Sequence, residues 1–318
     1  MKIVIPGGSG QIGTMLARAY SKAGGEVVIL SRKAAAESAW RVCEWDARSL
    51  GDWAAEFEGA DAVINLAGRS VNCRYTPENR RAIIESRVDS TGVIAQAMAR
   101  ASRPPRVWLQ MSTATIYAHR YDAPNDETSG IIGGDEPNAP DTWRFSIEVA
   151  KAWERAVQAA GPLPHTRTVL LRAAMTMSPD AGGVFDTLLG LVRHGLGGSS
   201  GDGRQFVSWI HETDFVHAIR WLIEHDTVSG SVNLAAPNPL PNADFMRALR
   251  EAWGIRIGLP AAKWMLEIGA IFLRTETELI LKSRHVIPGL LTQNGFIFQF
   301  PAWPDAARDL CSQWRALR

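Results

Sequence analysis

The sequence predicts an α/β fold in which a doubly wound parallel sheet is joined to a smaller, mainly helical C-terminal domain. Through the first half of the chain, short apolar and β-branched runs alternate with long helical segments. This rhythm is typical of parallel sheets built from strand–helix–strand units. After residue 172 the alternation stops, and helical segments dominate from residue 237 onward. A length of 318 residues also favours about two domains.

The first element expected is a strand over residues 1–6, followed at once by a glycine-rich loop over residues 7–13 and a helix over residues 14–22. This order of strand, loop and helix is the context that a dinucleotide-binding motif requires. Glycines let the main chain turn tightly and approach a pyrophosphate, and free N–H groups at the start of the helix face the phosphate charge. An ordinary glycine turn is the alternative. The loop residues assigned to the cofactor are Gly7, Gly10, Gln11, Ile12 and Gly13.

The second strand, expected over residues 26–30, indicates which dinucleotide binds. A site that prefers NAD would carry an acidic residue near the end of this strand to hold the ribose 2′-hydroxyl. This chain has Ser31, Arg32 and Lys33 there instead. A guanidinium can hold a 2′-phosphate through a forked pair of charged hydrogen bonds. The sequence therefore predicts NADP(H), with Arg32 as the main ligand and its two neighbours assisting; a solvated basic turn is the alternative.

The other strands of the sheet are expected wherever a short apolar run recurs. They cover residues 41–45, 61–66, 106–111, 166–171 and 231–235. Long helices over residues 77–101 and 143–159 lie between them. In the second half we expect a helix that opens at residues 180–183 and ends at 194, a strand over 206–211 and a helix over 212–224.

The predicted domains follow from this order of elements. The dinucleotide-binding domain comprises residues 1–171 plus 211–236, because the last strand is expected to return to the sheet. The substrate domain comprises residues 172–210 plus 237–318 and is expected to cover the carboxyl ends of the strands. Ligands of open α/β sheets bind in the cleft at those ends.

Composition and charge argue against several classes of protein. Lysine and arginine number 34, and aspartate and glutamate 33, so the net charge of +1 gives no argument for a nucleic acid or an anionic membrane as partner. No window approaches the ~20 apolar residues of a membrane span. The apolar stretch over residues 264–273 is interrupted by Glu267. The expected partner is a small-molecule substrate, and the chain is expected to be a monomer or a homodimer.

Cysteine usage indicates a reducing compartment. Cys43, Cys73 and Cys311 are odd in number and widely scattered, which fits neither a disulfide framework nor a metal site. The histidines show no metal-ligand spacing. A strand is expected from the first residue, so no signal peptide is expected before the fold. We therefore expect a cytoplasmic protein without a bound metal.

Short motifs from one end of the chain to the other add a family resemblance. They lie at residues 7–13, 65–68, 74–76, 86–91, 112–117, 152–154, 201–205, 208–211 and 233–239. Together they resemble the extended and atypical short-chain dehydrogenase/reductases, and more closely the nucleoside-diphosphate-sugar epimerase-like family that carries a C-terminal domain of unknown function. The resemblance implies an NADP(H)-binding Rossmann domain. Its cofactor residues would be Gly7, Gly10, Gln11, Ile12, Ser31, Arg32, Asp46, Leu66, Ala67 and Gly68.

For two of these positions the resemblance implies a specific contact with the cofactor. Asp46 falls where such folds put a carboxylate acceptor for the adenine amino group; a helix N-cap before Ala47 is the alternative. Ala67 and Gly68 follow a strand and are expected along the phosphates and ribose of the cofactor, where small residues allow close approach.

The resemblance also implies a reaction chemistry. Short-chain dehydrogenases move a hydride between the nicotinamide and a substrate carbon, a Tyr exchanges the hydroxyl proton, and a Ser or Thr hydroxyl polarises the carbonyl. A Lys four residues after the Tyr lowers the pKa of that Tyr. Thr113 falls at the Ser/Thr position, with Ser112 as the fallback. Counting back four residues from Lys151 gives Ile147, so the usual Tyr is missing. Lys151 then either holds the nicotinamide ribose or is a solvated helix lysine.

Another residue would have to act as the acid. Tyr117, one turn past Thr113, is expected at the rim of the predicted cleft, with Tyr75 and His119 as further candidates. Packing in the core is the alternative role for Tyr117.

Arginines suit bidentate contacts with a substrate phosphate. Arg74, Arg87 and Arg204 are placed for such a contact, and Arg204 most of all, because it follows a glycine turn where related epimerases meet the diphosphate of their substrate. A surface or ion-pair role is the alternative for each. His211 ends a strand expected to face the cleft, with a structural, hydrogen-bonded histidine as its alternative.

The function expected from the sequence is that of an NADP(H)-dependent oxidoreductase or epimerase of the short-chain dehydrogenase/reductase superfamily. Its substrate would be an unidentified small molecule, with nucleotide sugars as one class. The alternative is an NADP(H)-binding regulatory or redox-sensing protein without turnover, which the missing Tyr favours.

Overall fold

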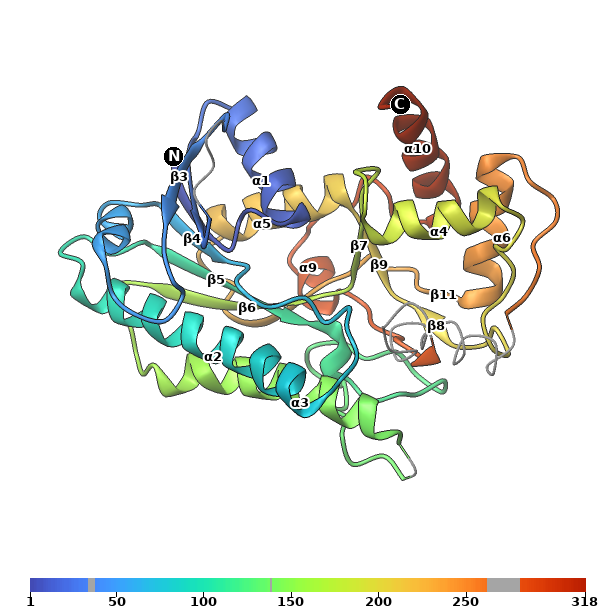
Figure 1. Cartoon of the computed structure of the whole chain (residues 1–318), viewed down its shortest axis with the longest axis horizontal. Coiled ribbons are helices and arrows are strands. Elements are labelled where there is room, and N and C mark those ends of the chain that lie inside the picture. The colour runs from blue at the N-terminus through green and yellow to red at the C-terminus, as the bar shows by residue number, and fades with distance from the viewer. Residues whose placement is uncertain (34–37, 138, 262–280) are drawn as a thin grey trace.

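The computed structural model describes residues 1–33, 38–137, 139–261 and 281–318. At its centre is a seven-stranded sheet in the order β10-β6-β5-β4-β1-β2-β3, in which every pair of neighbours is parallel (Figure 1). This confirms the predicted parallel sheet and the return of the last strand to it. The strands are β1 (Lys2–Pro6), β2 (Glu26–Ser31), β3 (Arg41–Glu44), β4 (Ala62–Asn65), β5 (Val107–Thr113), β6 (Arg167–Ala173) and β10 (Gly230–Leu234).

Helices cover both faces of the sheet, as a doubly wound fold requires (Figure 1). On one face lie α1 (Gln11–Lys22) and α5 (Glu212–Glu224), which contact each other. On the other face, α2 (Pro77–Arg100) and α3 (Asp141–Ala159) run side by side. Each helix begins or ends within a few residues of its expected place.

Side chains of successive strand residues supply the two halves of the core. In β1, Ile3 and Ile5 belong to the buried cluster beneath α1 and α5, whereas Val4 belongs to the cluster beneath α2. This alternation is the period-two pattern of a strand buried on both faces. Local signals fix the helix ends: at α2, Thr76 accepts from the N–H of Asn79 at 3.3 Å, and a proline occupies the first turn.

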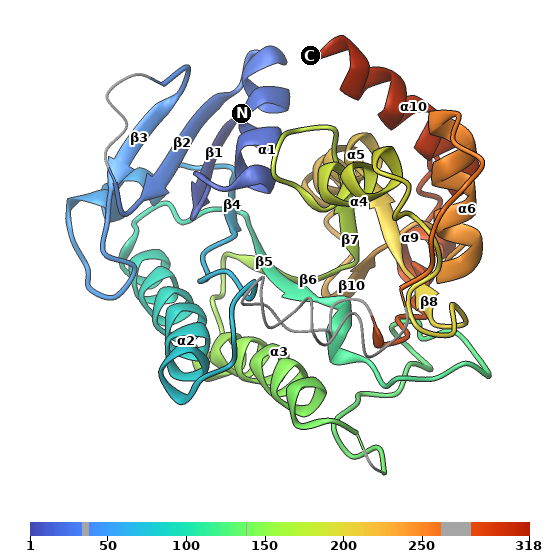
Figure 2. The same ribbon diagram turned by 45° about the vertical axis from the view of Figure 1, so that its right-hand side comes forward.

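A smaller unit stands at the carboxyl ends of the strands (Figure 2). Its helices are α4 (Val184–Arg193), α6 (Asn242–Trp253) and α10 (Trp303–Ala316), and the short α9 (Gly289–Gln293) packs on β10. Residues of α4, α6 and α10 share an apolar cluster separate from that of the sheet. Its largest buried side chains include Phe185, Trp209, Phe245 and Trp303.

One predicted strand is wrong. Residues 206–211 form two strands, β8 (Phe206–Val207) and β9 (Trp209–His211), on either side of Ser208. β8 pairs antiparallel with β11 (Leu240–Pro241), and β9 pairs parallel with β7 (Met175–Met177). The hydroxyl of Ser208 donates to the carbonyl of Arg284 at 2.5 Å and accepts from the N–H of Val286 at 2.8 Å, so a distant segment occupies the hydrogen-bonding groups at the break.

The apolar stretch over residues 264–273 lies outside the described residues. Among the helices that are described, none is both long enough and apolar enough to cross a bilayer.

Candidate functional site

The glycine loop between β1 and α1 shows three different reasons for glycine. Gly7 has a φ of +73°, and a Cβ there would lie 2.6 Å from the Cα of Ala67. A Cβ on Gly13 would lie 2.3 Å from the Cα of Gly8, so α1 packs directly on the loop. Gly10 is exposed, and a Cβ there would meet nothing closer than 4.0 Å. The loop is thus packed tightly from behind and open where α1 begins, as a pyrophosphate site needs.

The carboxyl end of β4 lies beside this loop. Asn65 is fully buried; it donates to the side chain of Gln110 on β5 at 2.9 Å and accepts from the N–H of Ala67 at 3.0 Å. These two hydrogen bonds hold the turn that sets Ala67 against Gly7 and leaves Gly68 exposed. Because β1, β4 and β5 are parallel neighbours, the glycine loop, Gly68 and the end of β5 share one edge of the sheet.

The end of β2 carries the basic residues expected to choose the cofactor. Arg32 and Lys33 are exposed, whereas Ser31 is buried and its Oγ accepts from the N–H of Lys33 at 3.3 Å. Ser31 therefore holds the turn from which two cations extend. Their contact with a 2′-phosphate stays a prediction.

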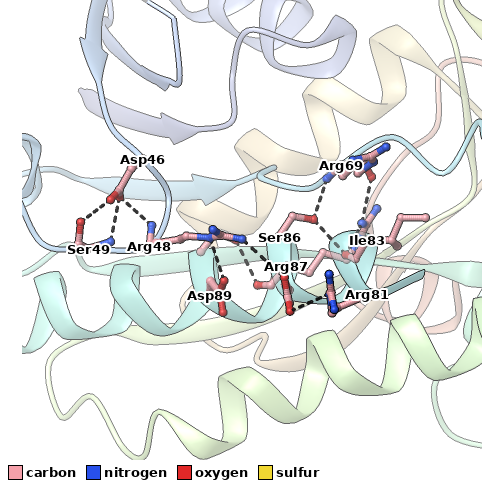
Figure 3. Close-up of polar contacts among 11 residues, drawn as sticks. Asp46, Arg48, Ser49, Arg69, Arg81, Ile83, Ser86, Arg87 and Asp89 are labelled. Atoms are coloured by element: carbon pink, nitrogen blue, oxygen red, sulfur yellow. Dashed lines mark hydrogen bonds and ion pairs between the residues drawn. The ribbon is translucent and has the colours of Figure 1, made fainter. Parts of the chain in front are cut away.

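Asp46 organises the turn that follows β3 (Figure 3). Its carboxylate accepts from the hydroxyl of Ser49 and from the N–H groups of Ser49 at 2.9 Å and Arg48 at 2.8 Å. Hydrogen bonds from Ser49, and then from the backbone of Arg48, lower the pKa of Asp46 to about 2. Asp46 thus has a local capping role, in a turn rather than at a helix, and its contact with adenine stays a prediction.

A contact that the sequence did not predict joins the glycine loop to the smaller unit. The side chain of Gln11 lies against Gly183 at the start of α4, where a Cβ would be 2.1 Å from Gln11 Nε2. That Nε2 is buried and has no acceptor among the described residues. Farther along α1, Arg18 forms an ion pair with Asp180, just before Gly183. Ile12 turns the other way and packs on the apolar core, as does Leu66.

The two hydroxyls at the end of β5 differ. Ser112 is buried and donates to Glu154 Oε1 at 2.7 Å. Glu154 also accepts from Arg172 on β6, from Nε at 2.9 Å and from Nη2 at 2.8 Å. Thr113 is half-buried; its Oγ1 accepts from the N–H of Thr115 at 3.2 Å, and its own proton has no acceptor in the part of the chain that the structure describes. Thr113, and not Ser112, therefore has a hydroxyl proton to offer a ligand.

Tyr117 does not stand at the rim of a cleft, and that prediction is wrong. The short turn η2 (Ala114–Ile116) carries it inward, where it is 2% exposed. Its hydroxyl donates to Asn233 at 2.9 Å and accepts from Arg172 Nη1 at 3.0 Å. Burial raises the pKa of Tyr117, although Arg172 opposes the shift. The side chain is part of a buried polar network, as its alternative role anticipated.

The face of α3 that meets β5 is marked by three residues spaced four apart. Residues at this spacing occupy successive turns of one helix face. Glu154 bonds to Ser112, and Ala150 packs in a buried cluster with Ala114 and Tyr117. The third residue of the face, Ser146, lies one turn farther toward the carboxyl edge of the sheet.

Ile147 and Lys151 lie on a neighbouring face. A Cβ on Gly133 would be 2.9 Å from Ile147 Cδ1, and one on Gly134 would be 3.1 Å from Lys151 Nζ. Both side chains therefore contact the loop that precedes α3. The spacing of Ile147 and Lys151 does not show which way their side chains point, and the structure turns both toward this loop. A ribose contact of Lys151 stays a prediction that this placement does not support.

Tyr75, from the segment between β4 and α2, does lie at the face that meets β5. Its hydroxyl is 3.4 Å from Ser146 Oγ, and its ring packs edge-on against Phe145 with centroids 4.8 Å apart. His119 is occupied elsewhere, since its Nδ1 accepts from the N–H of Ser283 at 2.7 Å. Burial lowers the pKa of His119, which keeps the ring neutral.

The candidate substrate residues have different surroundings. Arg204 is exposed, with its guanidinium carbon 5.8 Å from the centre of the Tyr121 ring. Arg74 is half-buried in the turn before α2. His211 is fully buried: its Nε2 lies 3.1 Å from Asp309 Oδ2, and its Nδ1 accepts from the first turn of α5. His211 therefore caps a helix, its structural alternative, and substrate contacts of Arg74 and Arg204 stay predictions.

The edge shared by β1, β4 and β5 fits a dinucleotide. Gly7 and Gly13 admit no side chain, Gly10 is open, and Gln11 holds a buried amide donor that no described residue satisfies. Thr113 lies at the end of the same edge, and no described residue accepts its hydroxyl proton. In the described parts of the chain, no three His, Cys, Asp or Glu side chains gather where a metal ion could be held.

Comparison with known sequences agrees with this site. A profile of the NAD dependent epimerase/dehydratase family matches residues 3–235. The chain belongs to this family. A profile of a domain of unknown function, DUF1731, matches residues 261–310 of the same epimerase-family chain. The resemblance to epimerase-like proteins with such a C-terminal domain is therefore confirmed.

Similar proteins span nearly the whole of this family member. Epimerase family protein SDR39U1 of Homo sapiens is 30% identical over 98% of this chain and 99% of its own. A crystal structure of human epimerase family protein SDR39U1 (isoform 2) with NADPH has a TM-score of 0.84 at 29% identity, covering 98% of this chain and 99% of that one. A nucleoside-diphosphate sugar epimerase from Corynebacterium glutamicum has a TM-score of 0.75 at 26% identity, over 100% of this chain and 61% of that one.

Proposed function

We propose that this epimerase-family member is an NADP(H)-dependent oxidoreductase or epimerase acting on a small molecule, with nucleotide sugars as the first substrate class to test. The observation that supports this most is the glycine loop, packed against Ala67 from behind and open at Gly10. The human relative was crystallised with NADPH. A cytoplasmic location and a monomeric or homodimeric state remain predictions from the sequence.

Each part of the cofactor has a proposed partner along the shared edge of the sheet. The loop of residues 7–13 would hold the pyrophosphate, and Ala67 and Gly68 would lie along the phosphates and ribose. Arg32 and Lys33, both exposed, would bind the 2′-phosphate. Arginine favours this partner because its fork matches two phosphate oxygens, whereas an acidic residue there would repel them.

NADP(H), when bound, supplies or accepts a hydride. Thr113 would donate its hydroxyl proton, which no described residue accepts, in a hydrogen bond to the carbonyl oxygen of the substrate, which makes the carbonyl carbon more electrophilic. Tyr75 is the tyrosine we propose for proton exchange at that oxygen, because its hydroxyl lies at the face of α3 that meets β5. Ser146 Oγ, 3.4 Å away, would orient the Tyr75 hydroxyl.

A second candidate function is favoured by the same face of α3. It carries Ser146 and Ala150, four residues apart, and neither has the phenol or the amine of the Tyr and Lys that a short-chain dehydrogenase uses at this spacing. A chain without that pair could keep the cofactor site and serve as an NADP(H)-binding regulatory or redox-sensing protein without turnover.

A turnover assay separates the two functions. NADPH oxidation is followed by absorbance with a panel of nucleotide sugars, aldehydes and quinones, and epimerisation is followed by NMR. On a substrate that reacts, Thr113→Ala is expected to lower turnover about 100-fold, the usual effect of losing one hydrogen-bond donor to a developing oxyanion. Thr128→Ala, on the surface, is the matched control and should keep full turnover. NADPH binding without turnover on any substrate would favour the sensor, and full turnover in Thr113→Ala would exclude the role given to Thr113.

A further inference from the structure

Arg87 of α2 is a buried cation whose guanidinium forms hydrogen bonds through Nη1 alone among the described residues. Its side chain is 9% exposed, and its guanidinium carbon lies 4.7 Å from the ring centre of Trp153 on α3. Nη1 donates to the carbonyl of Arg69 at 3.0 Å and to the carbonyl of Ile83 at 2.9 Å (Figure 3). The surface role considered for Arg87 is therefore wrong.

No acidic side chain among the described residues pairs with Arg87. The acidic residues near it on α2 pair with other cations. Glu85 lies 3.7 Å from Arg81. Asp89 lies 3.2 Å from Arg48 (Figure 3). Burial lowers the pKa of Arg87 to about 10, and the one group that opposes this shift is Tyr75. A phenol carries a negative charge only when it loses its proton. A buried charge without a counter-charge costs several kcal/mol, so an anion is expected at this site in the working protein.

The part of Arg87 that remains unbonded has a definite geometry. Nε is buried and has no acceptor, and Nη2 forms no hydrogen bond with any residue that the structure describes. These two N–H groups point the same way along one edge of the guanidinium. Such a fork matches two oxygens of one phosphate or carboxylate.

That guanidinium lies directly behind the loop at the end of β4. A Cβ on Gly68 would be 3.1 Å from Arg87 Cζ and 3.3 Å from Nη2, so a side chain at Gly68 would crowd the unbonded edge of the guanidinium. Gly68 is exposed and follows Ala67, against which Gly7 of the glycine loop packs. Arg87 thus contacts the backbone that the proposed function places along its ligand.

We propose that Arg87 binds a phosphate oxygen of a nucleotide that lies over Ala67 and Gly68. The inference deepens the proposed function and rests on it. The shared chemistry is a phosphoanhydride, which comes either from the cofactor or from the diphosphate of a nucleotide substrate. Arg32 would bind the 2′-phosphate, which only NADPH carries. If the cofactor is the ligand, Arg87 would bind the pyrophosphate, which NADPH and NADH have in common.

Calorimetric titrations of the full chain test this proposal. The ligands are NADPH, NADH and inorganic pyrophosphate, and UDP is titrated in the presence of saturating NADPH. Arg87→Met keeps the length of the side chain over Trp153 and removes the charge; Arg87→Lys keeps the charge and removes the fork. Gly68→Ala leaves Arg87 in place and crowds Nη2. Arg81→Met, exposed on the same helix, is the matched control for a lost charge.

If the cofactor supplies the anion, Arg87→Met should weaken NADPH and NADH by the same factor, about tenfold or more, as expected for a lost charge-assisted hydrogen bond. Arg87→Lys should recover part of the loss, Gly68→Ala should weaken both ligands, and Arg81→Met should change neither. If a substrate supplies the anion, Arg87→Met should instead lose affinity for UDP and pyrophosphate. Unchanged affinities for all four ligands in Arg87→Met, with a lower melting temperature, would show a purely structural residue and overturn the proposal. If the wild type binds neither dinucleotide, the proposed function fails, and pyrophosphate alone decides on Arg87.

Discussion

At the scale of single residues, the surroundings of Tyr117 decide what its hydroxyl can do. It bonds to Asn233 and Arg172 in the core, so Tyr117→Phe leaves two buried polar groups without a partner. We expect a loss of about 1–3 kcal/mol in the free energy of unfolding, measured by urea denaturation. On any substrate that reacts, the rate and its pH profile should stay as in the wild type.

Tyr75→Phe is the matched comparison, because it removes the same atom from the face of α3 that meets β5. It should lower turnover and shift the pH profile. The opposite pattern, with the rate lost in Tyr117→Phe and kept in Tyr75→Phe, would return the acid role to Tyr117.

The residues that could be predicted from the sequence are those whose role is local. Gly7 and Gly13 are required by the tight turn and close packing of the loop in which they lie. The order of strand, loop and helix along the sequence is enough to find them. Tyr117 could not be placed, because its burial depends on Asn233 and Arg172, which are distant in sequence. The sequence marked Arg87 as one of three candidate phosphate ligands, but its burial could not be predicted, because that burial comes from Trp153 and Gly68.

At the scale of elements, the rotation of α3 decides whether a tyrosine can be restored to the site. Ile147 is 1% exposed and contacts Gly133, so Ile147→Tyr forces a larger ring against that loop. Overpacking of this kind costs about 1–3 kcal/mol. We expect a lower melting temperature and no gain in NADPH oxidation, and Ile147→Val serves as the control for altered volume.

A large gain in turnover from Ile147→Tyr would contradict this account of α3. The limits of the helix were predictable because its ends and its length follow from local sequence. Its rotation was not, because four-residue spacing fits both the face of Ser146 and that of Ile147. The rotation of α3 is fixed by the hydrogen bond between Glu154 and Ser112, which is a tertiary contact.

At the scale of the whole molecule, histidines lie where the C-terminal residues meet the rest of the chain. His119 accepts from Ser283, His211 bonds to Asp309, and His285 stacks on Phe206. Burial lowers the pKa of all three. The unfolded histidines, with a pKa of ~6.5, therefore take up protons before the folded ones as the pH falls. Stability from this source is complete above pH ~6.5 and is lost as the pH falls toward the folded pKa values.

Thermal and urea melts at several pH values between about 7.5 and 5 should therefore show stability decreasing with acid. Each histidine contributes a slope of at most about 1.4 kcal/mol per pH unit. His211→Gln retains an acceptor for the start of α5 and cannot titrate. The variant should lose less stability than the wild type over this range; an equal loss in both would show that His211 does not contribute.

The order of strands and helices across the whole molecule could be predicted, because apolar runs and helical segments alternate in the sequence itself. The contact of Gln11 with Gly183 could not, since it joins the glycine loop to a helix of the smaller unit. Neither residue has a pattern that points to the other. The division of the predicted strand 206–211 at Ser208 could not be predicted for the same reason, because Ser208 bonds to residues 284 and 286, which are distant in sequence.

The central claim is that this chain binds NADP(H) through its glycine loop and selects it through Arg32. Calorimetric titration of the wild type and of Arg32→Ala with NADPH and NADH tests this most directly. The account predicts that the wild type binds NADPH more tightly, and that Arg32→Ala loses about 10- to 100-fold in affinity for NADPH while its affinity for NADH is nearly unchanged. Equal or tighter binding of NADH by the wild type, or an equal loss for both dinucleotides in Arg32→Ala, would contradict it.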